Sequence, residues 1–126
     1  MLIRFRQTGD FRKTENFLHN IRVMNFLKNL DKYGQKGVDA LSEATPVDTG
    51  ETASSWYYKI TQSDYSTSVI WSNSNVNKGV NIAIILQYGH GTGTGGYVEG
   101  RDYINPAMRP IFDEMAEKMW KEVQAL

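Results

Sequence analysis

The segment that decides the fold, residues 82–126, reads IAIILQYGHGTGTGGYVEGRDYINPAMRPIFDEMAEKMWKEVQAL. It begins with an apolar block at 82–86 and continues through a loop at 89–96 in which most residues are glycine. We expect this loop to hold no single conformation by itself, because glycine loses more backbone entropy on ordering than any other residue. A mobile loop between a rigid block and a rigid helix indicates a contact with another protein.

The C-terminal helix has both a start signal and an apolar stripe. Asn105 is a good N-cap, and Pro106 suits the first helical position, where an amide hydrogen would have no partner. Apolar residues then recur at three- and four-residue spacing, which predicts one continuous apolar face. Its members are Met108, Ile111, Phe112, Met115, Met119, Val123 and Leu126.

The N-terminal segment predicts a strand and a short helix. Residues 2–6 alternate between apolar and basic side chains, which is typical of a half-exposed strand. Thr14 is the expected cap of a helical segment in which Phe17, Leu18 and Ile21 share one face. A helix this short is marginal by itself, so we expect it to need a partner surface.

A firmer helix is predicted at about 25–44. It must end before Pro46, because the residue preceding a proline is pushed out of the helical region. Gly34 and Gly37 lie near its apolar face, and each weakens a helix by about 1 kcal/mol relative to alanine. We therefore expect another backbone, a strand or the C-terminal helix, to approach closely at these two glycines.

The middle of the chain predicts a β-hairpin. Residues 54–61 and 67–72 alternate as two strands, and 62–64 join them. The polar tract 73–79 reads as a loop, and residues 80–88 fit either a strand or a short helix. Tyr97 and Val98 predict a further brief strand.

These patterns predict an α+β domain, in which an antiparallel β-sheet packs against a long helix of the N-terminal half and a C-terminal amphipathic helix. We assign residues 1–126 to one domain, with an N-terminal strand and short helix at 1–24 and the core at 25–126. The side chains expected in the core are Leu27, Leu30, Leu41, Trp56, Tyr58, Ile60, Ile84, Leu86, Ile111, Phe112, Met115 and Met119.

Charge is balanced over the whole chain but uneven along it. The chain carries 14 basic and 14 acidic residues, which gives no strong electrostatic reason to expect nucleic-acid binding. Residues 1–30 are nevertheless net basic, and residues 99–126 are net acidic. This asymmetry fits either two solvated helix faces or head-to-tail complementarity between neighbouring subunits of a ring.

Patterns typical of catalysis, cofactors and metals are not evident. The chain has no cysteine, and its two histidines, His19 and His90, lack metal-ligand spacing. The glycine loop does not match a phosphate-binding P-loop, and no serine lies in a nucleophile elbow. Neither a signal peptide nor a membrane span is predicted. An enzyme is therefore not expected, although an activity using His90 stays open as a third possibility.

A nucleic-acid-binding module is the main alternative. Trp56, Tyr57, Tyr58 and Trp71 lie on the predicted hairpin, where aromatic rings can stack on bases, and the N-terminus is basic. The hairpin holds only Lys59 as a cation, so core packing explains most of these aromatic residues better.

Three segments together resemble a known family. They are ATPVDTG at 44–50, LQYGHGT at 86–92 and YINPAM at 103–108. In this order and spacing, over about residues 27–126, they are similar to the small head–tail connector, or tail-completion, proteins of long-tailed bacteriophages and prophages. The chain has Thr45 where the family more usually has alanine, and Gln87 where it tends to have glutamate.

The resemblance implies a structural virion protein of the phage neck, made in the cytoplasm of the host bacterium. Such a protein would form a ring, by expectation a hexamer, that joins the head connector to the tail tube, without catalysis and away from any membrane. DNA would pass through the lumen without specific binding. Near-zero net charge suits that lumen, because each phosphate contact adds affinity through counterion release.

Partner contacts are expected from the loops 73–79 and 89–100 and from the N-terminal segment. The candidate interface residues are Asn73, Asn75, Asn77, Lys78, Gly89, His90, Gly91, Thr92, Gly93, Thr94, Gly95, Gly96 and Tyr97. A separate group is expected to form a structural turn between the helix and the hairpin, namely Pro46, Asp48, Thr49 and Gly50.

Overall fold

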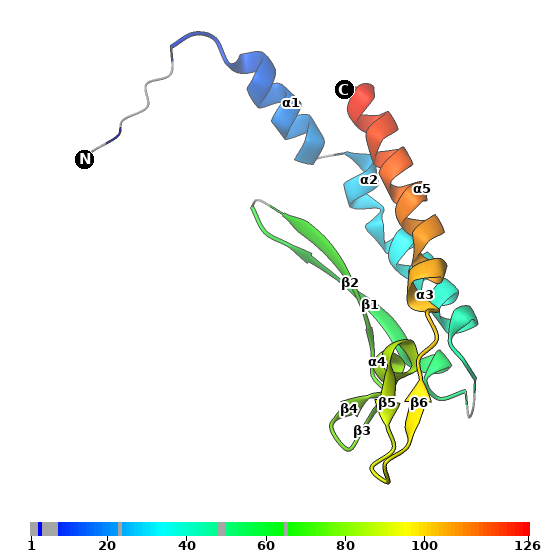
Figure 1. The fold of residues 1–126 in the computed structure, drawn as a ribbon. Coiled ribbons are helices and arrows are strands. Elements are labelled where there is room, and N and C mark those ends of the chain that lie inside the picture. Colours follow the sequence, from blue (N-terminus) through cyan, green and yellow to red (C-terminus); the bar gives the residue numbers. More distant parts are fainter. Residues whose placement is uncertain (1–2, 4–7, 23, 48–49, 65) are drawn as a thin grey trace.

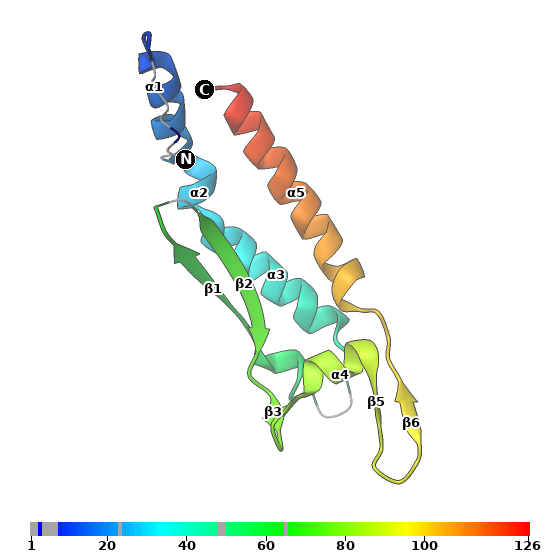
Figure 2. The same ribbon diagram turned by 60° about the vertical axis from the view of Figure 1, so that its left-hand side comes forward.

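The computed structural model describes residues 3, 8–22, 24–47, 50–64 and 66–126. The described residues form an elongated α+β structure of helices and short, two-stranded antiparallel sheets (Figures 1 and 2). The predicted fold class is therefore confirmed. In chain order, the elements are α1 (Arg12–Arg22), α2 (Asn25–Lys28), α3 (Leu30–Ala44), a 3-10 turn (Ala53–Ser55), β1 (Trp56–Gln62), β2 (Thr67–Asn73), β3 (Val76–Asn77), β4 (Val80–Asn81), α4 (Ile82–Tyr88), β5 (Gly89–Gly91), β6 (Tyr97–Glu99) and α5 (Ile104–Gln124).

The N-terminal helix is confirmed, with an earlier start than predicted. Asp10 rather than Thr14 supports its first turn, because the Asp10 carboxylate accepts a hydrogen bond of 3.0 Å from the backbone nitrogen of Arg12. Most of the strand predicted at 2–6 lies outside the described residues, and Ile3, its one described member, is not in a strand.

The helix predicted at 25–44 is divided at Asn29 into α2 and α3. Asn29 has φ −113° and ψ 24°, outside the helical well, and its side-chain nitrogen donates to the carbonyl of Asn25 at 2.8 Å. The predicted end is confirmed: Thr45 is extended, as expected before Pro46.

The hairpin of β1 and β2 packs on α3 through aromatic side chains. A methyl group added at Gly34 would overlap the ring of Tyr58, and one added at Gly37 would overlap the indole of Trp71. The Trp71 Nε1 also donates to the Gly34 carbonyl at 2.9 Å. The predicted close approach is thus present, but it is made by aromatic rings and not by a second backbone.

Helix α5 lies along α3 on the side away from the hairpin, as both ribbon views show. The Lys36 Nζ and Glu114 Oε1 are 2.7 Å apart, and a Glu122 carboxylate oxygen accepts from the backbone nitrogen of Phe26 at 2.7 Å. Near α2, the principal apolar cluster consists of Met24, Phe26, Leu30 and Tyr33. Half-buried side chains from four other elements pack against it, among them Ile21, Ile60, Val69, Met115 and Val123.

The predicted core was partly wrong. Leu30 and Leu41 are buried, but Ile84, Phe112 and Met119 are 46%, 52% and 43% exposed. The other predicted core residues are half-buried. The reason is that α3 covers only one side of α5, so part of the C-terminal apolar stripe stays exposed, although the Phe112 ring has an edge contact with Trp71 at 5.9 Å between ring centroids. The predicted core also left out six buried apolar side chains, namely Met24, Phe26, Tyr33, Ala83, Tyr103 and Met108, of which Met108 is part of the predicted C-terminal apolar stripe.

The expected start of the last helix was also wrong. The α5 N-cap is Tyr103, so Asn105 and Pro106 lie within its first turn. Residues 80–88, for which the sequence allowed either a strand or a short helix, contain both: β4 comes first and α4 follows. The polar tract at 73–79 is not wholly a loop either, because β3 within it pairs with β4.

Candidate interaction surface

The glycine-rich segment forms a β-hairpin, contrary to the expectation of a loop with no single conformation. Strands β5 and β6 pair antiparallel with His90 opposite Val98, and the backbone nitrogen of Thr92 donates to the Gly96 carbonyl at 3.0 Å. We call residues 89–99 the glycine hairpin. The brief strand predicted at Tyr97 and Val98 is confirmed as part of β6.

Two glycines allow the base of this hairpin to close. Gly89 has φ +86°, which is strained for residues with a Cβ, and a Cβ there would overlap the backbone of Val98 and Gly100. A Cβ at Gly100 would overlap the Gln87 carbonyl and the Gly89 nitrogen. The two chain segments therefore touch backbone to backbone where the hairpin leaves the body.

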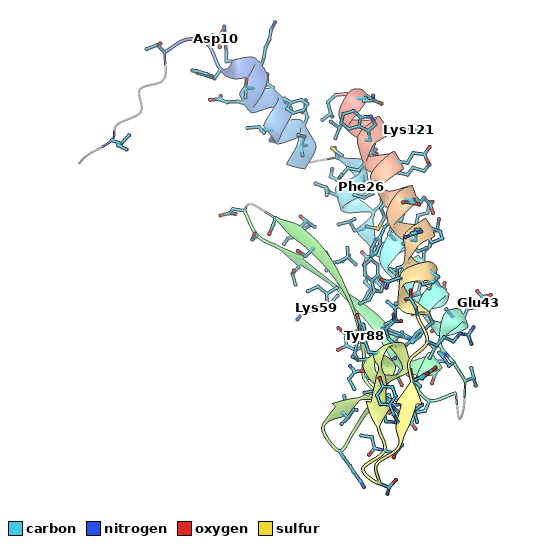
Figure 3. The ribbon with its side chains drawn as sticks, in the orientation of Figure 1. Asp10, Phe26, Glu43, Lys59, Tyr88 and Lys121 are labelled. Carbon is cyan, nitrogen blue, oxygen red and sulfur yellow. The ribbon has the colours of Figure 1, made fainter. Side chains whose placement is uncertain are left out.

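The glycine hairpin projects from the end of the body opposite α1, and large side chains on it are exposed (Figure 1). Tyr88 at its base is 70% exposed and Tyr97 is 65% exposed. The Tyr97 hydroxyl donates to the Tyr88 carbonyl at 3.1 Å, so the two residues are adjacent. Figure 3 labels Tyr88 at this end of the molecule. Exposed aromatic residues of this kind are typical of protein interfaces.

His90 occupies a half-buried position in β5. Its Nδ1 is buried and has no hydrogen-bond partner among the described residues. Within the described part of the chain, His, Asp and Glu side chains form no group of three or more that could hold a metal ion.

The candidate interface residues at 73–78 fall into two groups, one held in the structure by side-chain hydrogen bonds and one exposed. Asn73 is buried, with its Nδ2 donating to the Thr52 carbonyl at 2.8 Å and its Oδ1 accepting from the Asn75 nitrogen at 2.9 Å. The Asn75 Nδ2 donates to the Thr52 hydroxyl at 2.8 Å. These two side chains hold the loop, whereas Asn77 and Lys78 are exposed at the turn between β3 and β4.

The predicted structural turn faces the asparagine loop. Pro46 and Gly50 line a hollow of about 380 Å³ together with Asn75 and Asn77. Asp48 and Thr49 lie outside the described residues, so their predicted role stays a prediction.

Gln87 joins the glycine hairpin to α5. Its Oε1 accepts from the backbone nitrogens of both Tyr103 and Ile104 at 3.0 Å, and its Nε2 donates to Asp102 Oδ1 at 2.7 Å. A side chain distant in sequence therefore does the work of an N-cap, which satisfies amides that a helix start leaves without partners. Sequence reasoning noted Gln87 only as a departure from the family's glutamate and missed this role.

Two further hydrogen bonds, one buried and one partly buried, complete the same junction. The Tyr103 hydroxyl donates to the Ala83 carbonyl at 2.6 Å, and the Trp56 Nε1 donates to the Thr45 hydroxyl at 2.8 Å. Burial raises the pKa of Tyr103 to about 12, and a hydrogen bond with Thr45 opposes that rise. The three segments that carry the family resemblance thus meet at one place.

Many large apolar side chains of the described residues are exposed to solvent. Large apolar side chains are exposed on every part of the body, and among them are Phe11, Phe17, Leu18, Tyr57, Ile70, Tyr88, Tyr97, Phe112, Met119, Trp120 and Leu126.

The aromatic residues of the β1–β2 hairpin do not form an open stacking platform. Tyr58 and Trp71 cover the glycines of α3, and Trp56 is hydrogen-bonded to Thr45. Of the four aromatic residues considered for stacking, Tyr57 is exposed and Trp56, Tyr58 and Trp71 are half-buried.

Comparisons of the chain with family models, with curated proteins and with solved structures found no match. Among the described residues, none of the helices combines the length and hydrophobicity needed to cross a lipid bilayer.

Proposed function

We propose that this chain is a structural protein of the phage neck, a ring subunit that joins the head connector to the tail tube and has no catalytic role. The observation that carries the proposal is the exposed apolar surface. Eight apolar residues are buried among the described ones, whereas aromatic and aliphatic side chains are exposed at both ends of the body. Such a surface is typical of a chain that is covered by other proteins in its working state.

The junction around Gln87 supports the same proposal. The segments 44–50, 86–92 and 103–108 were singled out for their resemblance to tail-completion proteins, and described residues from all three form one hydrogen-bonded unit. This unit holds the glycine hairpin against the start of α5. A projecting element on a rigid support is suited to docking with the connector or the tube.

The two ends of the body suit different partners. The glycine hairpin lies at one end and α1 at the other, as Figure 2 shows. In the proposed ring, the hairpin end contacts the connector or tube, and DNA passes through the lumen without specific binding. The balanced charge of 14 basic and 14 acidic residues agrees with a lumen that does not hold DNA.

The alternative, a small nucleic-acid-binding module, has one observation in its favour. A hollow of about 540 Å³ between α2, α3 and α5 is lined by Lys28, Lys32, Lys118 and Lys121. Asp31 and Glu122 line the same hollow, however, so its excess positive charge is small. The packed state of Tyr58 and Trp71 removes most of the stacking surface that this alternative requires.

A binding experiment separates the two functions. The chain is mixed with connector protein, with tail-tube protein and with single-stranded oligonucleotide, each over a series of salt concentrations, and the mass of the product is followed by light scattering. The neck proposal expects a complex with connector or tube protein and none with oligonucleotide. Oligonucleotide binding that weakens steeply with salt, without either protein complex, would favour the alternative.

A further inference from the structure

The glycine hairpin has two strand edges that no third strand of the described chain covers. Strands β5 and β6 form a two-stranded sheet of their own (Figure 2). An isolated two-stranded hairpin is marginally stable in water, and a stable sheet needs further strands or a packing surface. The β1–β2 hairpin has such a surface on α3, whereas Tyr97 and Val98 of the glycine hairpin are 65% and 47% exposed. Among the described residues, the glycine hairpin therefore lacks the support that a stable sheet requires.

A hydrogen bond beside the turn shows which backbone groups point outward. The Thr92 nitrogen donates to the Gly96 carbonyl at 3.0 Å, so these two residues form a hydrogen-bonded pair. Hydrogen-bonded and non-hydrogen-bonded pairs alternate along an antiparallel ladder. The next pair, Gly91 opposite Tyr97, is therefore non-hydrogen-bonded, and its N–H and C=O groups point away from the hairpin.

A second outward position lies on each strand. Glu99, two residues beyond Tyr97, directs its backbone groups outward in the same way. Gly89 does so on β5, but its nitrogen already donates to the Ile85 carbonyl. The β6 edge thus offers ladder hydrogen bonds at Tyr97 and Glu99, and the β5 edge offers them at Gly91.

Neither edge carries the features that prevent strands from pairing. Natural proteins protect exposed edges with lysine, with proline or with β-bulges. Residues 89–99 contain no proline, their single charged residue is Glu99, and the register of the two strands is continuous. Both edges are therefore suited to the addition of another strand.

We propose that β6 of one copy pairs antiparallel with β5 of the next copy, so that the glycine hairpins of the ring form one closed sheet. The inference rests on the proposed ring and names a contact between neighbouring subunits. Each copy carries one β5 edge and one β6 edge, so a head-to-tail contact covers both edges of every hairpin. A strand from a different protein would cover one edge and leave the other exposed, which is why a second copy is the better partner.

The space at Gly91 agrees with this pairing. A Cβ added at Gly91 would have its nearest neighbour, the Gly96 carbonyl oxygen, at 3.9 Å, so the face of the strand is open there. An aromatic ring on an adjacent strand packs well over such a glycine, and Tyr97 of the next copy supplies one. The pairing uses the strand edges, so the turn at 93–95 stays available to the connector or the tube.

Cysteine cross-linking tests the contact directly, because the native chain contains no cysteine. When Gly91 of one copy pairs with Tyr97 or Glu99 of the next, Val98 lies opposite His90 or Thr92. Val98→Cys is therefore placed in one chain and His90→Cys or Thr92→Cys in a second, tagged chain. The two chains are co-expressed, mixed with connector and tail-tube proteins, and oxidised.

The matched control carries Val98→Cys in both chains. A head-to-tail contact brings β6 beside β5 and not beside another β6, and a disulfide needs Cβ atoms within about 4.5 Å. The proposal expects a mixed disulfide from position 98 to position 90 or 92 that is several-fold more abundant than the 98–98 product. A 98–98 product that equals or exceeds both mixed products would overturn the proposal.

A proline substitution gives a second readout. Glu99→Pro removes an outward N–H and leaves the hydrogen bonds between β5 and β6 in place, so it should lower the mass of the assembly toward 14.4 kDa. Thr94→Pro, in the exposed turn, is the control and should leave that mass unchanged. Circular dichroism checks that both variants keep the fold. Rings that form normally with Glu99→Pro would overturn this contact and leave the ring proposal standing, whereas a wild-type chain that stays monomeric alone and with neck proteins would overturn both.

Discussion

The side-chain oxygen of Gln87 lies 3.0 Å from the backbone nitrogen of Ile104, the first residue of α5. It lies at the same distance from the nitrogen of Tyr103, so one amide group serves two donors at a helix start. Because Gln87 lies two residues before the glycine hairpin, this capping contact also sets where the hairpin leaves the body. The hydrogen bonds of Gln87 therefore set the position of the glycine hairpin, which is the element proposed to dock on the connector or the tube.

Gln87→Ala should destabilise the fold by about 1–3 kcal/mol, because it leaves one buried and one partly buried amide at the start of α5, and the Asp102 carboxylate, without this partner. Urea unfolding followed by circular dichroism measures the change. Gln35→Ala, an exposed glutamine on α3, is the control and should change stability by less than about 0.5 kcal/mol. Equal effects at the two positions would show that the cap contributes nothing.

Gly34→Ala and Gly37→Ala should both destabilise the protein, although alanine favours a helix by about 1 kcal/mol over glycine. The added methyl groups would overlap the rings of Tyr58 and Trp71, and overpacking of this kind costs about 1–3 kcal/mol. Denaturant midpoints measure the outcome, with Glu43→Ala on the exposed side of α3 as the control (Figure 3). A gain in stability at either glycine would contradict the packing described.

Glu114 should contribute to the acid sensitivity of the fold. Its hydrogen bond with Lys36 holds the pKa of the Glu114 carboxyl below its ordinary value of 4.5. The unfolded chain therefore binds this proton more readily than the folded one. The stabilisation is present above pH 4.5 and is lost as the pH falls through the lower folded pKa.

The Glu114→Gln variant should accordingly lose less stability than the wild type on acidification, with Glu43→Gln as the control. The comparison is made by urea unfolding at neutral pH and below pH 4.5. Identical acid dependence in wild type and Glu114→Gln would mean that the ion pair has no effect in solution.

Tyr103 should make a contribution to the stability of the fold that is lost in strong alkali. Its pKa is raised from 10.0 to about 12 by burial, so the folded state keeps the hydroxyl proton longer than the unfolded state does. This contribution is fully present below pH 10 and disappears as the pH rises through the folded pKa near 12.

Tyr103→Phe removes both the hydroxyl and its 2.6 Å hydrogen bond to Ala83. Over pH 10 to 12, its stability should therefore fall less than that of the wild type. Ultraviolet titration of tyrosinate absorbance provides the second measurement, and the variant should lack the last ionisation step. Tyr57→Phe, at an exposed position, is the control.

Local patterns predicted the elements well where neighbouring residues determine them. The strands at β1 and β2 follow from alternation, and the end of α3 follows from Pro46. Gly34 and Gly37 correctly marked a close approach. The sequence could not show that aromatic rings make this approach, because Tyr58 and Trp71 are distant from the glycines along the chain.

The missed features depend on long-range contacts. An apolar stripe on α5 shows that a helix face will be covered, but it does not show whether the cover comes from the same chain. Phe112 and Met119 were therefore assigned to the core, although they are exposed in the single chain. Gln87 was missed as a cap for a similar reason, since its partners at Tyr103 and Ile104 lie beyond the glycine hairpin.

The most direct test of the central claim is native mass spectrometry of the chain, alone and mixed with connector and tail-tube proteins. The account predicts a closed assembly whose mass contains several copies of the 14.4 kDa subunit, at least when a neck protein is present. A single 14.4 kDa species under all of these conditions would contradict it.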